Sequence, residues 1–181
     1  MNRSTVAALA FLITSQFYLC PEGSADPGSL SREKANEFFA IHEGRWIGKV
    51  KATIGEAAMN KVDGESLNYL DMDYLESNGL LSYRNYGPRS GGRGFSHYDA
   101  EKKVIRGINH GVGGVVTYHE IYRGEEAWIR TSKQVLADGT TREFYSTIRF
   151  TDNNQTIQIE IRQSKDGKEG PSQTNVWRRI E

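Results

Sequence analysis

The chain has 181 residues, which is the size of one domain with a core of its own. Its 23 lysine and arginine residues balance 23 aspartate and glutamate residues, so the net charge gives no general attraction to nucleic acid or to an anionic membrane. Glycine is frequent (19 residues) and proline scarce (4), and glycine turns between aromatic and β-branched runs favour an all-β chain.

The N-terminal segment has the features of a secretory signal. A basic residue at position 3 precedes a mostly apolar run at 6–19, and small residues at 23–25 suit a signal peptidase. The run is too short for a comfortable membrane span, so no spanning segment is expected. We expect residues 1–25 to be a signal peptide and the protein to be exported, to the periplasm or outside the cell. The alternative is a lipid anchor at Cys20, although the residues just before it are bulky for a lipobox.

Cys20 is the only cysteine, and it would leave with the signal peptide. The mature domain would then have no disulfide, no thiolate nucleophile and no cysteine metal ligand. An exported domain without disulfides depends on its core alone. A closed barrel suits that condition, because closure removes the exposed edges of a sheet.

Residues 26–35 are predicted to be a polar tether that leads into a short helix. Ser31 is a suitable N-cap, and Gly44 ends the helical pattern. The residues that share one helix face, at i, i+3, i+4 and i+7, are Ala35, Phe38, Phe39 and His42. A short helix with a Phe-Phe face, placed before the first strand, could plug one end of a barrel.

Period-two alternation follows the helix. In residues 45–54, Trp46, Gly48 and Val50 point to one face and Lys49 to the other. Turn signals rich in glycine, asparagine and aspartate separate the further candidates. The candidate strands are 45–54, 66–75, 80–86, 94–98, 104–109, 115–122, 127–136, 141–150, 155–163 and 174–180.

This pattern predicts an all-β domain over residues 36–181: a closed antiparallel β-barrel of about ten strands, preceded by the short helix. A two-sheet sandwich is the alternative. Two glycine-rich stretches, 87–94 and 111–114, are predicted loops at the mouth or lid of the barrel. The alternative is that they are merely long hairpin connections.

Two short motifs carry a family resemblance. The segment Gly44-Arg45-Trp46-Ile47-Gly48 opens the first strand, and Trp177-Arg178-Arg179 lies in the last strand as its expected closing partner. Together with the strand number, they resemble the calycin superfamily of lipocalins and fatty-acid-binding proteins, and most closely the bacterial lipocalin-like domains of unknown function.

The resemblance implies that Trp46 closes the barrel floor with Arg178 or Arg179 over it. A guanidinium on an indole face is a cation–π contact that also covers an open end. The chain lacks the usual lipocalin disulfide and second motif, so a specific lipocalin function does not follow. The related haem-binding barrels use a histidine late in the chain, whereas none here lies beyond His119, and no cofactor is expected.

Long polar side chains on the central strands either face water or line a cavity. A tyrosine–arginine interior would suit a ligand with a carboxylate or other anionic head and an apolar body. The alternative is a packed core with the arginines outside. The candidate ligand-binding residues are Tyr83, His97, Arg106, His110, Tyr118, His119, Trp128 and Arg130.

Other chemistry has weaker support. Three imidazoles, His97, His110 and His119, could converge on a metal or act in acid–base chemistry, but cavity polarity or surface positions are the favoured interpretation. Asp71 and Asp73 share one strand face without the spaced loop ligands of a calcium site, so a solvated exterior is expected. No metal is assigned.

The sequence therefore predicts an exported, lipocalin-like barrel that binds a small apolar or amphipathic molecule without covalent chemistry of its own. No partner among nucleic acids and no membrane span are expected. Two alternatives stay open. One is an isomerase or hydrolase that uses a His/Tyr pair in the cavity. The other is a structural barrel with a filled core.

Overall fold

One short helix precedes ten strands in the computed structural model, which describes residues 29–51, 65–88, 91–165 and 168–180. The predicted signal peptide lies outside the described residues. The elements are α1 (Arg32–His42), β1 (Gly44–Lys51), β2 (Glu65–Leu75), β3 (Leu80–Tyr86), β4 (Gly91–Asp99), β5 (Val104–Gly111), β6 (Val116–Arg123), β7 (Trp128–Val135), β8 (Thr141–Thr151), β9 (Thr156–Lys165) and β10 (Lys168–Arg179), with short 3-10 turns at Glu76–Asn78 and Val112–Gly114.

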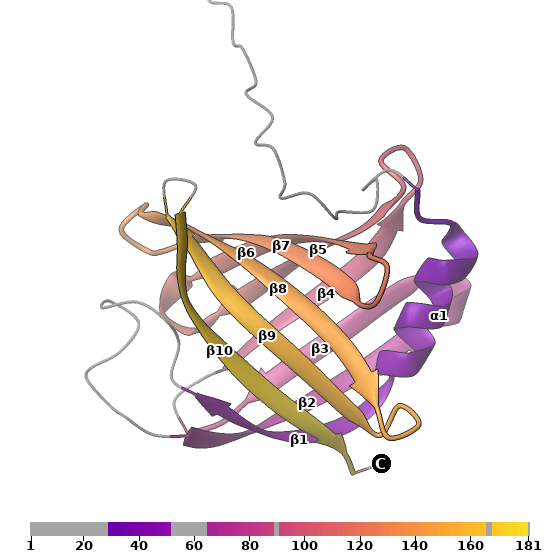
Figure 1. The fold of residues 1–181 in the computed structure, drawn as a ribbon, viewed down its shortest axis with the longest axis horizontal. Coiled ribbons are helices and arrows are strands. Elements are labelled where there is room, and N and C mark those ends of the chain that lie inside the picture. The colour runs from indigo at the N-terminus through magenta and orange to yellow at the C-terminus, as the bar shows by residue number, and fades with distance from the viewer. Residues whose placement is uncertain (1–28, 52–64, 89–90, 166–167, 181) are drawn as a thin grey trace, which may run out of the picture.

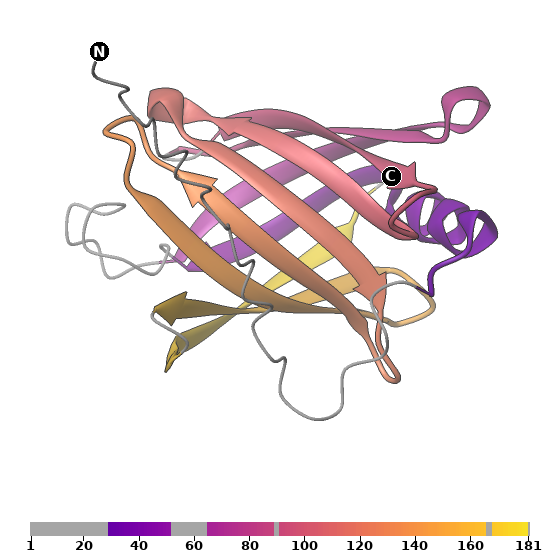
Figure 2. The same ribbon diagram turned by 90° about the horizontal axis from the view of Figure 1, so that it is seen from above.

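The strands form a closed antiparallel barrel. Each strand pairs with its neighbours in sequence, and β1 pairs with β10 to close the ring (Figures 1 and 2). The closing register aligns Trp46 with Arg179 and Gly48 with Trp177. The all-β barrel prediction is confirmed over the two-sheet sandwich, and the ring of β1–β10 has no free edge along which another chain could pair.

Two strands, β4 and β10, begin several residues earlier than the sequence pattern predicts. β4 starts at Gly91 rather than at Gly94, and β10 starts at Lys168 rather than at position 174. In β4 the glycines pair with the neighbouring strands and are not turn residues. A side chain at Gly94 would place its Cβ 2.5 Å from the Tyr83 Oη. Glycine inside a strand here permits close approach of a neighbouring side chain.

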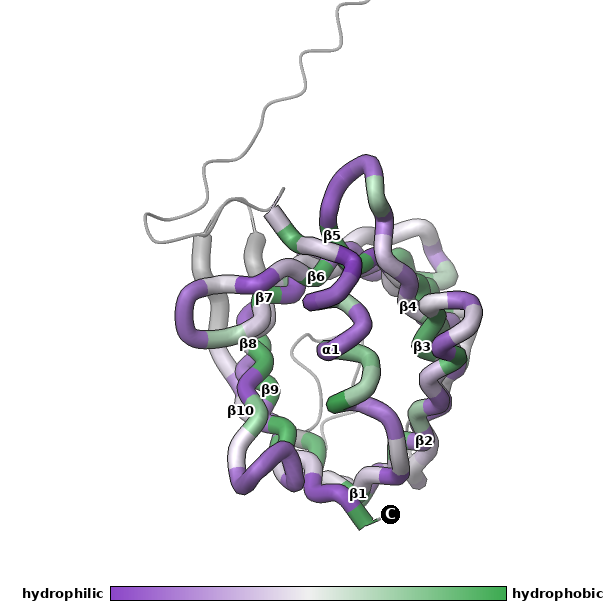
Figure 3. The backbone as a smooth tube through the Cα atoms, turned by 90° about the vertical axis from the view of Figure 1, so that its right-hand side faces the viewer, coloured by the Kyte–Doolittle hydropathy of each residue, from purple (hydrophilic) through white to green (hydrophobic). Residues whose placement is uncertain are grey.

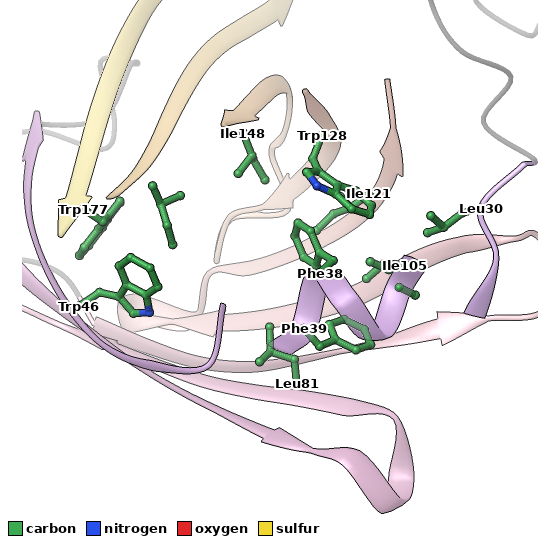
Figure 4. Close-up of a cluster of buried hydrophobic side chains, with 12 residues drawn as sticks. Leu30, Phe38, Phe39, Trp46, Leu81, Ile105, Ile121, Trp128, Ile148 and Trp177 are labelled. Atoms are coloured by element: carbon green, nitrogen blue, oxygen red, sulfur yellow. The ribbon is translucent and has the colours of Figure 1, made fainter. Parts of the chain in front are cut away.

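The α1 helix fills one end of the barrel, as predicted. Figure 3 looks along the barrel from this end, with the strands arranged around α1. Phe38 and Phe39 project from the helix between the strands, where Phe38 lies 4.6 Å from Trp128, measured between ring centroids (Figure 4). The buried hydrophobic cluster comprises Leu30, Ala35, Phe38, Phe39, Trp46, Leu81, Ile105, Ile121, Trp128, Ile148, Ile157 and Trp177.

Local hydrogen bonds fix the ends of α1. The Ser31 hydroxyl accepts from the Lys34 N–H at 3.2 Å, which confirms the predicted N-cap. The chain then leaves the helix through Gly44, whose φ of 117° favours glycine. Before the helix, the Tyr98 hydroxyl donates to the Leu30 carbonyl at 2.7 Å and ties this segment to the barrel.

Trp46 and Arg179 join the helix, the first strand and the last strand. The guanidinium carbon of Arg179 lies 4.2 Å from the centroid of the buried Trp46 ring. Arg179 also donates to the carbonyls of Ile41, at 2.6 Å, and Glu43, while the Trp46 Nε1 donates to the His42 carbonyl at 2.8 Å. The predicted contact of Trp46 with a C-terminal arginine is thus confirmed for Arg179, whereas Arg178 is exposed.

His42 is buried in the plug. Its Nδ1 lies 2.8 Å from the Phe38 carbonyl and therefore carries the proton that it donates. The ring packs on Phe38 at 3.9 Å and on Phe150 at 4.8 Å, measured between centroids. Burial, ahead of repulsion from Arg130 and Arg179, lowers the pKa of His42 to about 4.

We expect this burial to make the fold sensitive to mild acid. The native pKa of His42, about 4, lies below the ordinary value of about 6.5. Between these two values the unfolded chain binds more protons than the folded one, so stability is lost as the pH is lowered. His42 should account for a loss of roughly 2 kcal/mol between pH 7 and pH 5. Urea denaturation of the wild type and His42→Phe at both pH values measures it, since phenylalanine fills the site without titrating. Equal pH dependence in both proteins would contradict the assignment.

Candidate functional site

The inner face of the barrel away from α1 is polar. One antiparallel row across neighbouring strands aligns Tyr83, Gly94 and Asn109, and it continues through Thr117 and Gln134 to Arg142. We call the following inward residues of this region the polar half: Tyr83, Asn85, Asn109, Thr117, His119, Arg130, Ser132, Gln134 and Arg142. All of them are half-buried, whereas many inward residues at the helix end, among them Trp46, Leu81 and Ile105, are buried. The interior is thus tightly packed near α1 and keeps solvent contact in the polar half.

Apolar residues line the other side of the ring. Most of the polar half lies on β3–β7, whereas β1, β2, β8 and β9 contribute the half-buried side chains Val50, Leu70, Met72 and Ile159 and the buried Phe144. In the strand order of the barrel, β1 and β2 lie across the ring from β6 and β7. The interior therefore has a polar wall and, across the ring, an apolar wall that the buried polar side chains of Asn68 on β2 and Asn175 on β10 interrupt.

Inward glycines make room for the polar side chains. A Cβ at Gly107 would collide with the His119 ring and lie 2.5 Å from the Ser96 Oγ. A Cβ at Gly92 would lie 2.8 Å from the Asn85 Oδ1 and 3.0 Å from the Asn109 Oδ1. The bare backbone of β4 and β5 thus forms the surface on which these side chains lie.

Ser96 and His119 form a hydrogen-bonded pair beside Tyr83. The Ser96 Oγ lies 2.9 Å from the His119 Nε2, and the Tyr83 hydroxyl donates to the Ile108 carbonyl at 3.2 Å. Burial, followed by repulsion from Arg130, lowers the pKa of His119 to about 3. Burial also raises the pKa of Tyr83 above its usual value. Both side chains are therefore neutral at pH 7.

This pair is better suited to hydrogen bonding than to proton transfer. An efficient general base has a pKa near the working pH, and the pKa of His119, about 3, lies far below it. A hydrolase that uses Ser96 as a nucleophile would also need a group to orient the imidazole. Among the strand residues whose side chains the structure describes, no aspartate or glutamate points inward.

Arg130 is the central charged group of the interior. It lies on β7 opposite Ser146, and its Nη2 donates to the Ser146 Oγ at 3.4 Å. Its Nε is buried without a hydrogen-bond partner. Burial lowers the pKa of Arg130, and its charge lowers the pKa values of both His42 and His119. Arg130 is a cation that no inward carboxylate among the described residues neutralises.

Four of the eight residues predicted from the sequence lie on the inner face. Tyr83, His119 and Arg130 lie in the polar half, whereas Trp128 belongs to the apolar cluster beside Phe38. The structure brings the first three together: Arg130 influences the pKa of both others, and the rings of Tyr83 and His119 are 6.3 Å apart.

The other four predicted residues lie on the outer face, and the structure does not bring them near the inner four. His97, Arg106, His110 and Tyr118 are all exposed, Tyr118 by 51%. Arg106 forms ion pairs with Asp99 and Glu120, each at 3.3 Å, as a surface arginine does. The reason is strand parity, because each of these residues is one position away from an inward residue.

The three imidazoles considered for a metal site do not converge, since only His119 of the three points inward. Within the described residues, no group of three or more histidine, cysteine, aspartate or glutamate side chains could hold a metal ion. Asp71 lies on the outer face and pairs with Arg84 at 2.6 Å and Arg45 at 3.5 Å. The hydrogen bond from Arg84, ahead of the other causes, lowers the pKa of Asp71.

Six residues of the polar half were not predicted, and three of them carry unmet hydrogen-bonding capacity: Asn85, Asn109 and Arg142. Each carries a buried polar atom without a partner, the Oδ1 of both asparagines and the Nη1 of Arg142. The signal was present in the alternation, because Asn85 is in phase with Tyr83 and Arg142 is in phase with the buried Phe144.

Among the described residues, no helix is long and apolar enough to cross a bilayer. Comparison of the chain with models of known protein families finds no match, and comparison with curated proteins finds no similar sequence.

Proposed function

We propose that the protein binds a small amphipathic anion inside the barrel, with the acid group on Arg130. The observation that carries this proposal is the guanidinium of Arg130, which has a buried Nε without a partner and no inward carboxylate among the described residues. A buried charge without a counter-charge is costly, and a ligand acid group would supply the missing one. Because Arg130 as a residue is half-buried, part of its side chain stays accessible from the interior.

The surroundings of Arg130 suit such an acid group. Tyr83 and His119 are neutral and do not compete for the cation. The apolar wall, which includes Leu70, Met72 and Ile159, would receive the apolar body of the ligand. Charge-assisted hydrogen bonds to arginine are stronger than neutral ones and gain from the low dielectric of an interior.

The proposal also concerns the family to which the chain belongs and the compartment in which the protein acts. The closed ten-strand antiparallel barrel is consistent with the calycin superfamily, and we propose that the chain belongs to it as a lipocalin-like domain. Export of the protein rests on the N-terminal sequence pattern alone. Native mass spectrometry of the protein purified from its own compartment would reveal any acid that is carried along with it.

Titration calorimetry with dodecanoate and dodecanol tests the anion site, because the two probes differ only in the head group. We expect the wild type to bind dodecanoate more tightly, and Arg130→Gln to weaken dodecanoate binding by roughly 10- to 100-fold while changing dodecanol binding little. Arg149→Gln removes the same charge from the exposed face of β8 and serves as the control. Equal binding of dodecanoate by wild type and Arg130→Gln would refute the proposal.

A further inference from the structure

Arg142 is a second inward cation with unmet hydrogen-bonding capacity. Its Nη1 is buried without a partner, and the residue is half-buried in the polar half. Arg142 forms no ion pair with any residue in the described part of the chain. The pKa of Asp138, in the exposed turn at 137–139, is lowered chiefly by hydrogen bonds from Thr140 and only in last place by Arg142.

The two inward arginines lie at different depths. Arg130 is opposite Ser146, and its hydrogen bond to the Ser146 Oγ holds the guanidinium at that level. Arg142 lies four positions from Ser146 on the same face of β8, towards the end of the barrel away from α1. At the usual rise of a strand, the Cα atoms of these two β8 residues are about 13 Å apart.

An apolar side chain lies between the two levels. Phe144 is two positions from both Arg142 and Ser146, shares their inward face and is buried. Its cross-strand partner is the small residue Ser132. Along β8, the inner face therefore presents a cation, an aromatic ring and, at the level of Ser146, the second cation.

We infer that Arg142 is a second anion-binding residue and that the ligand is a diacid, with an acid group at each end of an apolar chain. This inference rests on the proposed anion site at Arg130 and specifies its ligand class. Two like charges on one inner face repel each other, and a ligand with one acid group would neutralise only one of them. A diacid supplies an acceptor to each arginine and places its methylene chain against Phe144.

The test compares sebacate with its monomethyl ester, which has the same carbon chain but one acid group. In titration calorimetry on the full-length protein, the wild type should bind sebacate about 10-fold more tightly than the ester. Arg142→Gln should remove this preference while leaving ester binding intact. Arg130→Gln should weaken both ligands, and Arg149→Gln, on the exposed face of β8, should change neither.

The outcomes separate this inference from the proposed function. If the wild type binds both ligands equally, or if Arg142→Gln keeps the preference for sebacate, Arg142 is not a second anion-binding residue, although Arg130 can still hold one acid. If neither ligand binds the wild type, the anion site at Arg130 fails and the inference fails with it. Circular dichroism of each variant checks that a lost preference is not a lost fold.

Discussion

Replacing Arg130 by methionine is expected to raise the free energy of unfolding of the ligand-free protein by about 2–4 kcal/mol. The Arg130 Nε is buried without a hydrogen-bond partner, and no inward carboxylate among the described residues faces the guanidinium. The folded state therefore bears the cost of desolvating a charge. Methionine has a similar length, no charge and enough flexibility to fill the same space. A residue that weakens the empty protein is one whose role lies in binding rather than in folding.

Urea denaturation in the absence and presence of dodecanoate measures this effect. The wild type should gain stability from dodecanoate by mass action, whereas Arg130→Met should begin more stable and gain little. Arg149→Met removes a cation from the exposed face of the neighbouring strand and should change stability by less than about 0.5 kcal/mol. A less stable Arg130→Met protein would mean that the guanidinium supports the fold, and the argument for a ligand anion would lose its basis.

The fold could be predicted because period-two alternation and turn residues recur along the whole chain. The errors lie at β4 and β10, whose first residues are rich in glycine or charged residues with weak strand propensity. Pairing with the neighbouring strands overrides that preference. In β4, the inward glycines also accommodate the side chains of Tyr83 and Asn85, a requirement that appears only once β3 lies alongside.

The site could be predicted only in part, because alternation groups residues by face without saying which face is inside. In β7, Trp128 shares a face with Arg130, and a large aromatic residue marks that face as inward. In β5, isoleucine occurs on both faces, at Ile105 and Ile108, so the pattern does not distinguish them. The inner face is that of Ile105, and Arg106 therefore points to solvent.

Truncating Trp46 to alanine is expected to cost about 3–5 kcal/mol and to leave a marginally stable barrel. Trp46 is fully buried, and its indole joins three elements: it projects from β1, lies under the Arg179 guanidinium of β10 and donates to the His42 carbonyl of α1. Alanine would leave a cavity at the closed end and remove the surface on which Arg179 rests. Trp46→Phe keeps an aromatic face under the guanidinium and loses the Nε1 hydrogen bond, so it should cost less.

A double-mutant cycle separates the packing of Trp46 from its contact with Arg179. Arg179→Ala removes the cation–π contact together with the hydrogen bonds to the carbonyls of Ile41 and Glu43. In urea denaturation followed by far-ultraviolet circular dichroism, Trp46→Ala and Arg179→Ala should together cost about 1–2 kcal/mol less than the sum of the single variants, because each removes the same shared contact. Additive costs would show that Arg179 holds the end of α1 through the carbonyls alone. A combined cost smaller than the sum would mean that the contact between Trp46 and Arg179 helps to join the first and last strands. The same contact anchors α1 at the end of the barrel opposite the polar half.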